Sequence, residues 1–283
     1  MKVSVVLPAK NESAAIEQTI KKIKQLSIVD EIIVVNDGST DKTSLVAEQA
    51  GARVIAHPYS KGNGAAIKTG ARHALGDIII FMDADGQHDP QDIPRLLEKI
   101  NQGYDLVVGA RQKGSQASVG RGIANKLYNN LASYMSDHTV EDLTSGFRAV
   151  RSDKFREFIY LLPNGFSYPT TSTMAFFRAG YSVAYVPIHA AKRIGKSHIH
   201  PVKDSVRFFL IIFKIATLYS PLKMFLPFAI LLFILATSWY GYTLYEFGRF
   251  TNMSALLYTG SIMVFLMGLI SEQITALMYK DSE

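Results

Sequence analysis

Three aspartates follow directly on a run of apolar residues, in the stretch FMDADGQHDP at positions 81–90. Asp83 and Asp85 are two positions apart, so on an extended segment both carboxylates point the same way and can share a divalent cation. The amide oxygen of Gln87 would lie on the same side. Hard oxygen ligands favour Mg²⁺ or Mn²⁺, and Mg²⁺ is usually held by one or two carboxylates together with substrate phosphates. The pattern therefore predicts a site for a metal ion and a phosphorylated substrate.

An isolated D-x-D pattern also fits a solvated turn, and its position at the end of a buried strand favours the metal site. Asp89 stands before Pro90, which predicts an N-cap for a helix over residues 90–101.

A second polar cluster is VVNDGSTDKT at positions 34–43. Asp37 sits where a predicted strand ends, Gly38 permits a tight turn, and Ser39 or Thr40 can cap the next helix. One interpretation is a capped loop without further function. The other is a contact with a nucleotide base, because a carboxylate accepts hydrogen bonds from the N–H edge of uracil or guanine. The contact does not separate UDP from GDP.

Short β-rich runs alternate with amphipathic stretches through the first hundred residues. The alternation predicts βαβ units on a mostly parallel sheet that is covered on both faces. Ligands of such sheets bind beyond the carboxyl ends of the strands, where both polar clusters fall. The predicted strands are Val3–Leu7, Glu31–Val35, Arg53–Ala56, Asp77–Met82 and Asp105–Val108, with helices over Ser13–Gln25 and Asp41–Ala50.

The chain becomes strongly apolar after residue 202. In the segment 203–220, Lys203, Arg207 and Lys214 fall on one narrow helical stripe, which predicts a helix lying in the membrane interface.

Two apolar runs follow, roughly Leu222–Tyr245 and Ala255–Tyr279. Each reaches the length of about 20 residues that crosses a bilayer, and a pair of buried core helices is the alternative. Basic residues precede the first run, so the positive-inside rule predicts a hairpin that leaves residues 1–202 in the cytosol. Glu272, near the inner end of the second run, is expected at the membrane interface.

Composition excludes several classes of function. The chain has 283 residues, 48% hydrophobic content, a net charge of +6 and no cysteine. Disulfides, thiolate nucleophiles and cysteine metal sites are therefore excluded. The modest positive charge suits phosphates or an anionic membrane face and is too small to predict nucleic-acid binding. No signal peptide is expected, because charged residues follow the first strand at once.

The motifs LPAKNE, VNDGSTD, KGNGAA, MDADGQH and LTSGFRAV stand in this order over most of residues 3–200. Together they resemble the family 2 inverting glycosyltransferases, nearest to the branch of dolichol-phosphate mannose synthase and the polyprenyl-phosphate glycosyltransferases. The resemblance implies a GT-A type, Rossmann-like α/β fold with a mostly parallel sheet. An interfacial helix and a two-helix transmembrane hairpin would follow, giving expected domains at 1–202, 203–220 and 221–283.

The resemblance also assigns roles to single residues. The nucleotide-binding set is Pro8, Ala9, Asn11, Glu12, Asp37, Lys61, Asp83 and Ala84, with the loop of Gly62 and Gly64 beside it. The metal ligands are Asp83, Asp85 and Gln87, and the catalytic set is Asp85, Arg111 and Arg121. The acceptor phosphate is expected at Arg121, Arg148, Arg193, Lys196 and His198.

Each basic residue also has an ordinary structural interpretation. Arg111 is either a surface arginine or a planar, bidentate clamp on a phosphate. Arg148 either pairs with Asp142 and braces its loop or contacts the acceptor. In the segment RIGKSH at positions 193–198, His198 stands where the family often has Lys or Arg, so the sequence does not decide whether this loop ends in a cation.

The implied function is a membrane-bound enzyme that moves a hexose from GDP-mannose or a UDP-sugar to a polyprenyl phosphate, for cell-envelope or protein glycosylation, with Mg²⁺ or Mn²⁺. One alternative is a glycosyltransferase with a hydroxyl acceptor, such as a glycolipid or polysaccharide, for which Asp142 is the nearest motif acid able to act as a base. The other is a non-catalytic membrane protein that binds nucleotide sugars. The expected partners are the nucleotide sugar, the lipid phosphate and the membrane, and a homo-oligomer is compatible with all three interpretations.

Overall fold

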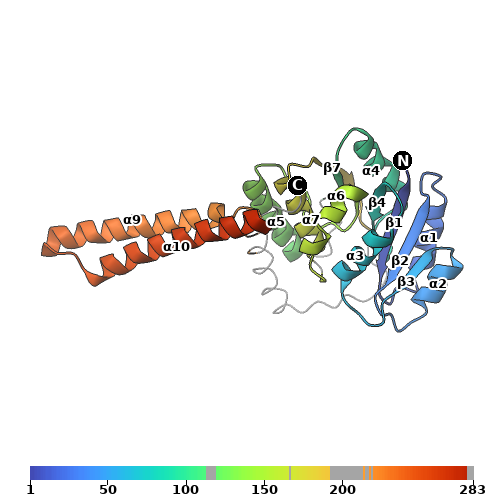
Figure 1. Cartoon of the computed structure of the whole chain (residues 1–283), viewed down its shortest axis with the longest axis horizontal. Helices are drawn as coiled ribbons and strands as arrows, with labels where there is room; N and C mark the ends of the chain where they lie inside the picture. Colours follow the sequence, from blue (N-terminus) through green and yellow to red (C-terminus); the bar gives the residue numbers. More distant parts are fainter. Residues whose placement is uncertain (113–118, 166, 192–212, 214–216, 218, 279–283) are drawn as a thin grey trace. The chain divides into compact units, whose positions relative to one another are not determined.

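The computed structural model describes residues 1–112, 119–165, 167–191, 213, 217 and 219–278. The chain divides into two compact units, Met1–Ile211 and Ile212–Glu283. The first unit is an α/β domain, and the second contains a pair of long helices (Figure 1). The predicted interfacial helix over 203–220 lies almost wholly outside the described residues. Every described residue that was predicted to take part in chemistry belongs to the first unit.

A seven-stranded sheet runs through the first unit in the order β3-β2-β1-β4-β6-β5-β7. β6 is antiparallel to its neighbours β4 and β5, and all other neighbouring strands are parallel. The sheet is therefore mostly parallel, as predicted. The strands are β1 (Val3–Ala9), β2 (Glu31–Asn36), β3 (Arg53–Ala56), β4 (Ile78–Phe81), β5 (Leu106–Arg111), β6 (Arg148–Arg151) and β7 (Val183–Ile188).

Helices cover both faces of this sheet (Figure 1). They are α1 (Ile16–Lys24), α2 (Thr43–Gln49), α3 (Asn63–His73), α4 (Ile93–Asn101), α5 (Val119–Ser136), α6 (Ser152–Glu157) and α7 (Tyr168–Arg178), with 3₁₀ turns η1 (Pro90–Asp92) and η2 (Ile159–Leu161). Val5 packs in one core cluster with Ile20 of α1 and Leu96 of α4. Val6 points the other way and meets α3, where a Cβ added to Gly70 would lie 2.2 Å from it. Because both faces are buried, β4 is continuously apolar and β1 has Ser4 as its single polar residue.

The five strands predicted from the sequence are confirmed, with ends that move by at most three residues. The two predicted helices between the first three strands are α1 and α2, and the predicted helix 90–101 consists of η1 and α4. Asp89 caps this element as predicted, because its side chain accepts a hydrogen bond from the Gln91 N–H at 3.3 Å. β6 and β7 were not predicted. β6 has only four residues, with an arginine at each end.

The second unit contains α9 (Pro221–Phe247) and α10 (Asn252–Met278), which pack against each other. Apart from Pro221 at the start of α9, their buried positions recur every seven residues and carry small side chains. These are Ala229, Ala236 and Thr243 in α9, and Ser254, Ser261, Gly268 and Thr275 in α10. A Cβ added to Gly268 would lie 2.9 Å from the Phe225 Cβ, so glycine permits the close approach of the helices there.

Both helices are long and apolar enough to cross a membrane, and large apolar side chains cover their outer surfaces. Glu272 lies beside the start of α9, where its carboxylate accepts hydrogen bonds from the Ser220 hydroxyl at 3.0 Å and from the Leu222 N–H at 3.2 Å. An otherwise unpaired amide of the first helical turn is thereby satisfied. Its predicted place at the membrane interface stays a prediction.

Candidate active site

The polar clusters predicted from the sequence follow the carboxyl ends of three adjacent strands. Ala9 pairs with Asn36 at the ends of β1 and β2, and Val6 pairs with Phe81 at the end of β4. The loops that begin at Lys10, Asp37 and Met82 therefore leave the same edge of the sheet. This edge is where ligands of parallel α/β sheets bind.

Asp37 is buried, and both of its oxygens are occupied by groups of the protein. Oδ1 is 2.8 Å from His57 Nδ1 and accepts a hydrogen bond from the Lys61 N–H at 2.8 Å. Oδ2 accepts hydrogen bonds from the Ser60 hydroxyl at 2.8 Å and from the Gly62 N–H at 2.9 Å. Burial would raise the pKa of Asp37, but these hydrogen bonds outweigh it and lower the pKa. Asp37 thus organises the loop 57–62, and its predicted contact with a nucleotide base stays a prediction.

The loops after β1 and β2 are tied together by Asn11, which has a left-handed backbone with φ of 57°. Its N–H donates to the Ser39 hydroxyl at 3.0 Å, and its side-chain oxygen accepts from the Thr40 N–H at 2.8 Å. The prediction that Ser39 or Thr40 caps the next helix is wrong, because the N-cap position of α2 is Lys42. Instead Asp41 accepts a hydrogen bond from the Thr43 N–H at 3.0 Å, at the start of α2.

Of the other predicted nucleotide-binding residues, Pro8 and Ala9 end β1, and Glu12 donates its N–H to the Thr43 hydroxyl at 3.0 Å. The Lys61 ammonium lies 5.6 Å from the centre of the Tyr59 ring on the exposed loop. Ala84 is buried between the two predicted metal ligands.

The KGNGAA motif packs tightly against the segment 163–165. The Gly64 N–H donates to the Gly165 carbonyl and the Ala65 N–H donates to the Asn164 carbonyl, both at 3.1 Å. A Cβ added to Gly64 would lie 2.0 Å from a carbonyl oxygen of this segment. Glycine is therefore required here because the two backbones lie in contact. The carbonyls of this segment also accept hydrogen bonds from the first N–H groups of α3.

Asp83, Asp85 and Gln87 form the predicted metal-binding set. The Asp83 side chain is 37% exposed, whereas Asp85 is buried and its Oδ1 accepts a hydrogen bond from the Gln87 N–H at 3.1 Å. The described residues contain no cluster of three His, Cys, Asp or Glu side chains that could hold a metal. Two carboxylates and one amide nevertheless fit Mg²⁺ or Mn²⁺ when a diphosphate supplies further oxygens.

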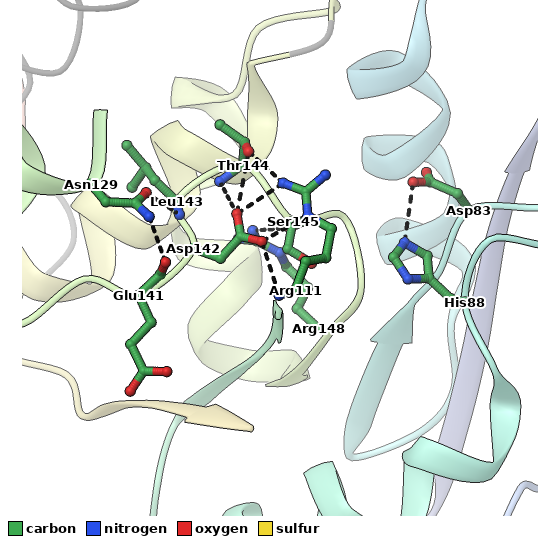
Figure 2. A network of polar contacts seen from close by, with 10 residues as sticks. All are labelled: Asp83, His88, Arg111, Asn129, Glu141, Asp142, Leu143, Thr144, Ser145 and Arg148. Atoms are coloured by element: carbon green, nitrogen blue, oxygen red, sulfur yellow. Dashed lines mark hydrogen bonds and ion pairs between the residues drawn. The ribbon is translucent and has the colours of Figure 1, made fainter. Parts of the chain in front are cut away.

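Two neighbours enclose the Asp83 carboxylate. His88 Nε2 lies 3.6 Å from Asp83 Oδ2, and the buried His88 ring packs 5.2 Å from the Phe147 ring, centre to centre. On another side, a Cβ added to Gly146 would lie 3.0 Å from Asp83 Oδ2. Figure 2 shows Asp83 and His88 as a pair facing the loop that carries residues 141–148. The sequence did not single out His88, whose only signal was its place directly after the aspartate motif.

Arg111, at the end of β5, forms an ion pair with Asp142 (Figure 2). Arg111 donates to Asp142 Oδ2 from Nε at 2.7 Å and to Oδ1 from Nη2 at 2.9 Å, and Nη2 also donates to the Thr144 hydroxyl at 2.6 Å. Burial opposes the charge of both groups, but their pairing raises the pKa of Arg111 and lowers that of Asp142. The charge of Asp83 also raises the pKa of Arg111, so the arginine lies within electrostatic reach of the metal-binding set.

Arg148 is fully buried at the start of β6. Its Nη1 donates to the Pro169 carbonyl at 3.0 Å and to the Ser172 hydroxyl at 2.7 Å, and its Nη2 donates to the Ser145 carbonyl. The predicted pairing of Arg148 with Asp142 is wrong, because Arg111 takes that carboxylate. Burial lowers the pKa of Arg148. Its contact with an acceptor stays a prediction, and so far its observed role is to clamp the start of α7 to the loop before β6.

The side chains of the other predicted acceptor residues are not described. Arg193, Lys196 and His198 lie in the segment 192–212, outside the described residues, and Arg121 lies in α5 with a side chain that is not described. Their roles stay predictions.

Asn129 of α5 is a site residue that sequence reasoning missed. Its side chain donates to the Glu141 carbonyl at 2.5 Å and accepts from the Leu143 N–H at 3.0 Å, so it fixes both neighbours of Asp142. No sequence pattern marks it, because asparagine on a helix usually faces solvent.

Comparisons with known proteins identify the family and the fold of the chain. The model of glycosyl transferase family 2 matches residues 4–159, and the model of the GtrB C-terminal hairpin matches residues 220–277. An undecaprenyl-phosphate 4-deoxy-4-formamido-L-arabinose transferase of Photorhabdus laumondii is 38% identical over 160 residues, covering 53% of this chain and 49% of that protein. Glycosyltransferase AglJ of Haloferax volcanii is 26% identical over 230 residues, covering 79% of this chain and 75% of that protein. The chain thus spans about half the length of the arabinose transferase.

Among solved structures, a glucosyl-3-phosphoglycerate synthase of Mycobacterium tuberculosis in complex with Mn²⁺, UDP-glucose and phosphoglyceric acid superposes with a TM-score of 0.63. The two proteins are 26% identical, and the match covers 76% of this chain and 79% of the synthase. The fold of the first unit is therefore the GT-A type, as predicted. Since the family model matches more than half of the 283 residues, this chain belongs to glycosyl transferase family 2.

Proposed function

We propose that this protein is a membrane-bound inverting glycosyltransferase that moves a hexose from a UDP- or GDP-sugar to a polyprenyl phosphate. One observation carries the proposal. The partly exposed carboxylate of Asp83 lies against Gly146, on the loop whose Asp142 forms the ion pair with Arg111, in a chain that continues into two helices of membrane-crossing length. Carboxylates for a metal and an arginine for a phosphate are the groups that a nucleotide sugar requires.

On the donor side, Asp83, Asp85 and Gln87 would hold a divalent metal together with the diphosphate. The metal would supply neutralisation of the charge that develops on the leaving nucleoside diphosphate. Arg111 would add a positive charge at the same place. Catalysis then depends on positioning and on electrostatic stabilisation, and the latter is usually the largest single contribution to enzyme catalysis.

On the acceptor side, a phosphate monoester has a second pKa of about 6 and is largely dianionic at neutral pH. Its oxygen can attack the anomeric carbon from the face opposite the leaving group, which inverts the configuration, and no general base is required. A hydroxyl acceptor would need a base. Asp142 is poorly suited to that role, because it is buried in an ion pair that lowers its pKa.

The domain order supports a lipid acceptor. We infer a catalytic domain over 1–202, an interfacial helix over 203–220 and a membrane hairpin over 221–283, with the catalytic domain on the cytosolic side. The arabinose transferase relative is named for undecaprenyl phosphate, and the second matched family is a C-terminal hairpin. A membrane anchor in the same chain would confine enzyme and acceptor to the same surface.

The test is sugar transfer by the purified full chain in liposomes that contain a polyprenyl phosphate. Radiolabelled UDP- and GDP-sugars would be supplied one at a time with Mg²⁺ or Mn²⁺. At least one sugar should enter the lipid fraction, and Asp85→Asn should lower turnover by about 10²-fold or more.

Asp89→Asn is the matched control, since Asp89 belongs to the same loop but caps a helix. It should retain turnover. If the parent bound a nucleotide sugar tightly and labelled no lipid with any donor, the non-catalytic alternative would be the better explanation.

A further inference from the structure

The Arg111 guanidinium has five N–H donors, and its environment uses three of them. Nε donates to Asp142 Oδ2, and Nη2 donates to Asp142 Oδ1 and to the Thr144 hydroxyl. Within the described part of the chain, no hydrogen bond from Nη1 is observed. Asp142 therefore occupies the Nε/Nη2 edge, and Thr144 takes the Nη2 N–H that the Nη1/Nη2 edge would need for a bidentate clamp on a phosphate. The side chain is 25% exposed.

The Asp142 carboxylate is equally committed. Oδ2 accepts from the Arg111 N–H at 3.2 Å in addition to Nε, and Oδ1 accepts from the Thr144 N–H at 3.1 Å in addition to Nη2. The Thr144 hydroxyl lies 3.3 Å from the same oxygen. The Asp142 side chain is only 4% exposed. A carboxylate with this many donors has no lone pair left to take a proton from a substrate.

The loop that carries this pair is itself fixed. Asn129 holds the carbonyl before Asp142 and the N–H after it. Figure 2 shows Arg111, Asp142 and Thr144 as one cluster, with Asn129 to its left beside Glu141 and Leu143. A supporting shell of this kind holds a functional group within the narrow geometry that charge stabilisation requires.

We propose that Asp142 and Thr144 are positioning residues that lock Arg111, so that Nη1 alone is presented to a phosphate oxygen of the nucleotide diphosphate. This inference rests on the proposed function and adds to it the geometry of the contact between Arg111 and the diphosphate. Arg111 makes a single-nitrogen contact whose direction is set from behind by an ion pair. The predicted bidentate clamp is thereby replaced by a narrower interaction.

Removal of the Asp142 charge has opposite consequences for binding and for turnover. Asp142→Asn takes away one negative charge beside Arg111, so the site becomes more positive and a nucleotide diphosphate should bind as well as before or more tightly. The guanidinium loses its fixed orientation, so kcat should fall by about 10²-fold, as small displacements of catalytic groups do. Thr144→Val removes one hydrogen bond and should lower kcat by about 5-fold. Thr144→Ser, which keeps the hydroxyl, should restore most of that loss.

A double-mutant cycle separates positioning from base catalysis. In an Arg111→Gln background, Asp142→Asn should change kcat by less than about 2-fold, because the residue acts only through the arginine. The double variant should also melt no lower than Arg111→Gln alone, since that single variant leaves a buried carboxylate without its cation. Asp105→Asn is the matched control, because Asp105 is also buried in an ion pair, with Lys154, and should leave kcat at the parental value.

The experiment uses the full chain with kcat and KM for both substrates, and calorimetric binding of UDP or GDP with Mn²⁺. The inference is overturned if Asp142→Asn lowers kcat in the Arg111→Gln background as much as in the parent, or if it weakens nucleotide binding about 10-fold. The failure of the proposed function has a different signature. In that case the parent itself transfers no sugar to the lipid phosphate.

Discussion

Asp37→Asn should destabilise the first unit strongly, because the carboxylate serves four donors. Oδ1 and Oδ2 each accept from one side chain and from one backbone N–H, those of Lys61 and Gly62. An amide nitrogen in place of either oxygen would face one of these two N–H groups. The hydroxyl of Ser60 can turn and the ring of His57 can change its tautomer, but a backbone N–H cannot become an acceptor.

The cost can be estimated from these contacts. One buried N–H without an acceptor costs about 1–3 kcal/mol, and the remaining hydrogen bonds lose the strength that a charged acceptor gives them. A total of about 3 kcal/mol is expected. For a domain of 150–250 residues, about 1 kcal/mol lowers Tm by about 2–4 °C, so Tm should fall by about 6–12 °C.

Scanning calorimetry of the full chain in detergent measures this shift. Asp41→Asn is the control, since Asp41 lies on the same loop and accepts from the Ser13 and Thr43 N–H groups near the surface. Its loss should cost about 1 kcal/mol, as for other helix caps. If Asp37→Asn melted within about 2 °C of the parent and yet lost nucleotide binding, Asp37 would be a base contact rather than a loop organiser.

Three further predictions concern packing and charge. Gly64→Ala should lower the free energy of unfolding by about 1–3 kcal/mol, because its Cβ would meet a carbonyl oxygen at 2.0 Å. Gly165→Ala is the control and should lower it by less than about 1 kcal/mol, because the added Cβ has no atom within 4 Å. Equal melting temperatures of the two variants would contradict the close approach of the two backbones at Gly64. Burial would raise the pKa of Asp105, but hydrogen bonds and the charge of Lys154 outweigh burial and lower the pKa. The ionised carboxylate therefore stabilises the fold above pH 3.8, its unfolded pKa, and this stabilisation is lost as the pH falls through the lower pKa of the folded state. In urea unfolding, Asp105→Asn should therefore lower the free energy of unfolding by about 1–3 kcal/mol at pH 7 and by much less at pH 3. An equal loss at the two pH values would contradict the predicted pH dependence. Gly268→Leu should make the hairpin more sensitive to protease in detergent, and Gly260→Leu, whose added Cβ meets nothing within 4 Å, should not; equal sensitivity would argue against the observed helix contact.

The sequence was most informative where burial and composition coincide. β1, β2 and β4 are buried on both faces, so they are mostly apolar runs that end at polar residues. The carboxyl edge of the sheet, with Asp37 and Asp83, was predictable for the same reason. β6 was not predictable, because its arginine ends resemble a surface segment and its place between β4 and β5 is decided by the tertiary fold.

The partners of the charged residues could not be predicted. Asp142 follows Arg111 by 31 positions, and Arg148 follows Asp142 by only six. Proximity in sequence made the pairing of Asp142 with Arg148 one of the two interpretations of that arginine. The pairing is instead set by the position of β5 beside β6. Arg148 lies opposite Val108 in the sheet, and the arginine side chain is buried in the core. Chain topology decides such contacts, and a motif gives only the residue types.

The central claim is tested most directly by phosphorus NMR of the lipid product. With the full chain, a divalent metal and the active nucleotide sugar, the monoester signal of polyprenyl phosphate should be replaced by a phosphodiester signal, and the attached sugar should have the inverted anomeric configuration. Asp85→Asn should leave the monoester unchanged, and polyprenol without phosphate should receive no sugar. Transfer of the sugar to polyprenol, or a lipid phosphate that stays a monoester while the sugar appears on another hydroxyl acceptor, would contradict the account.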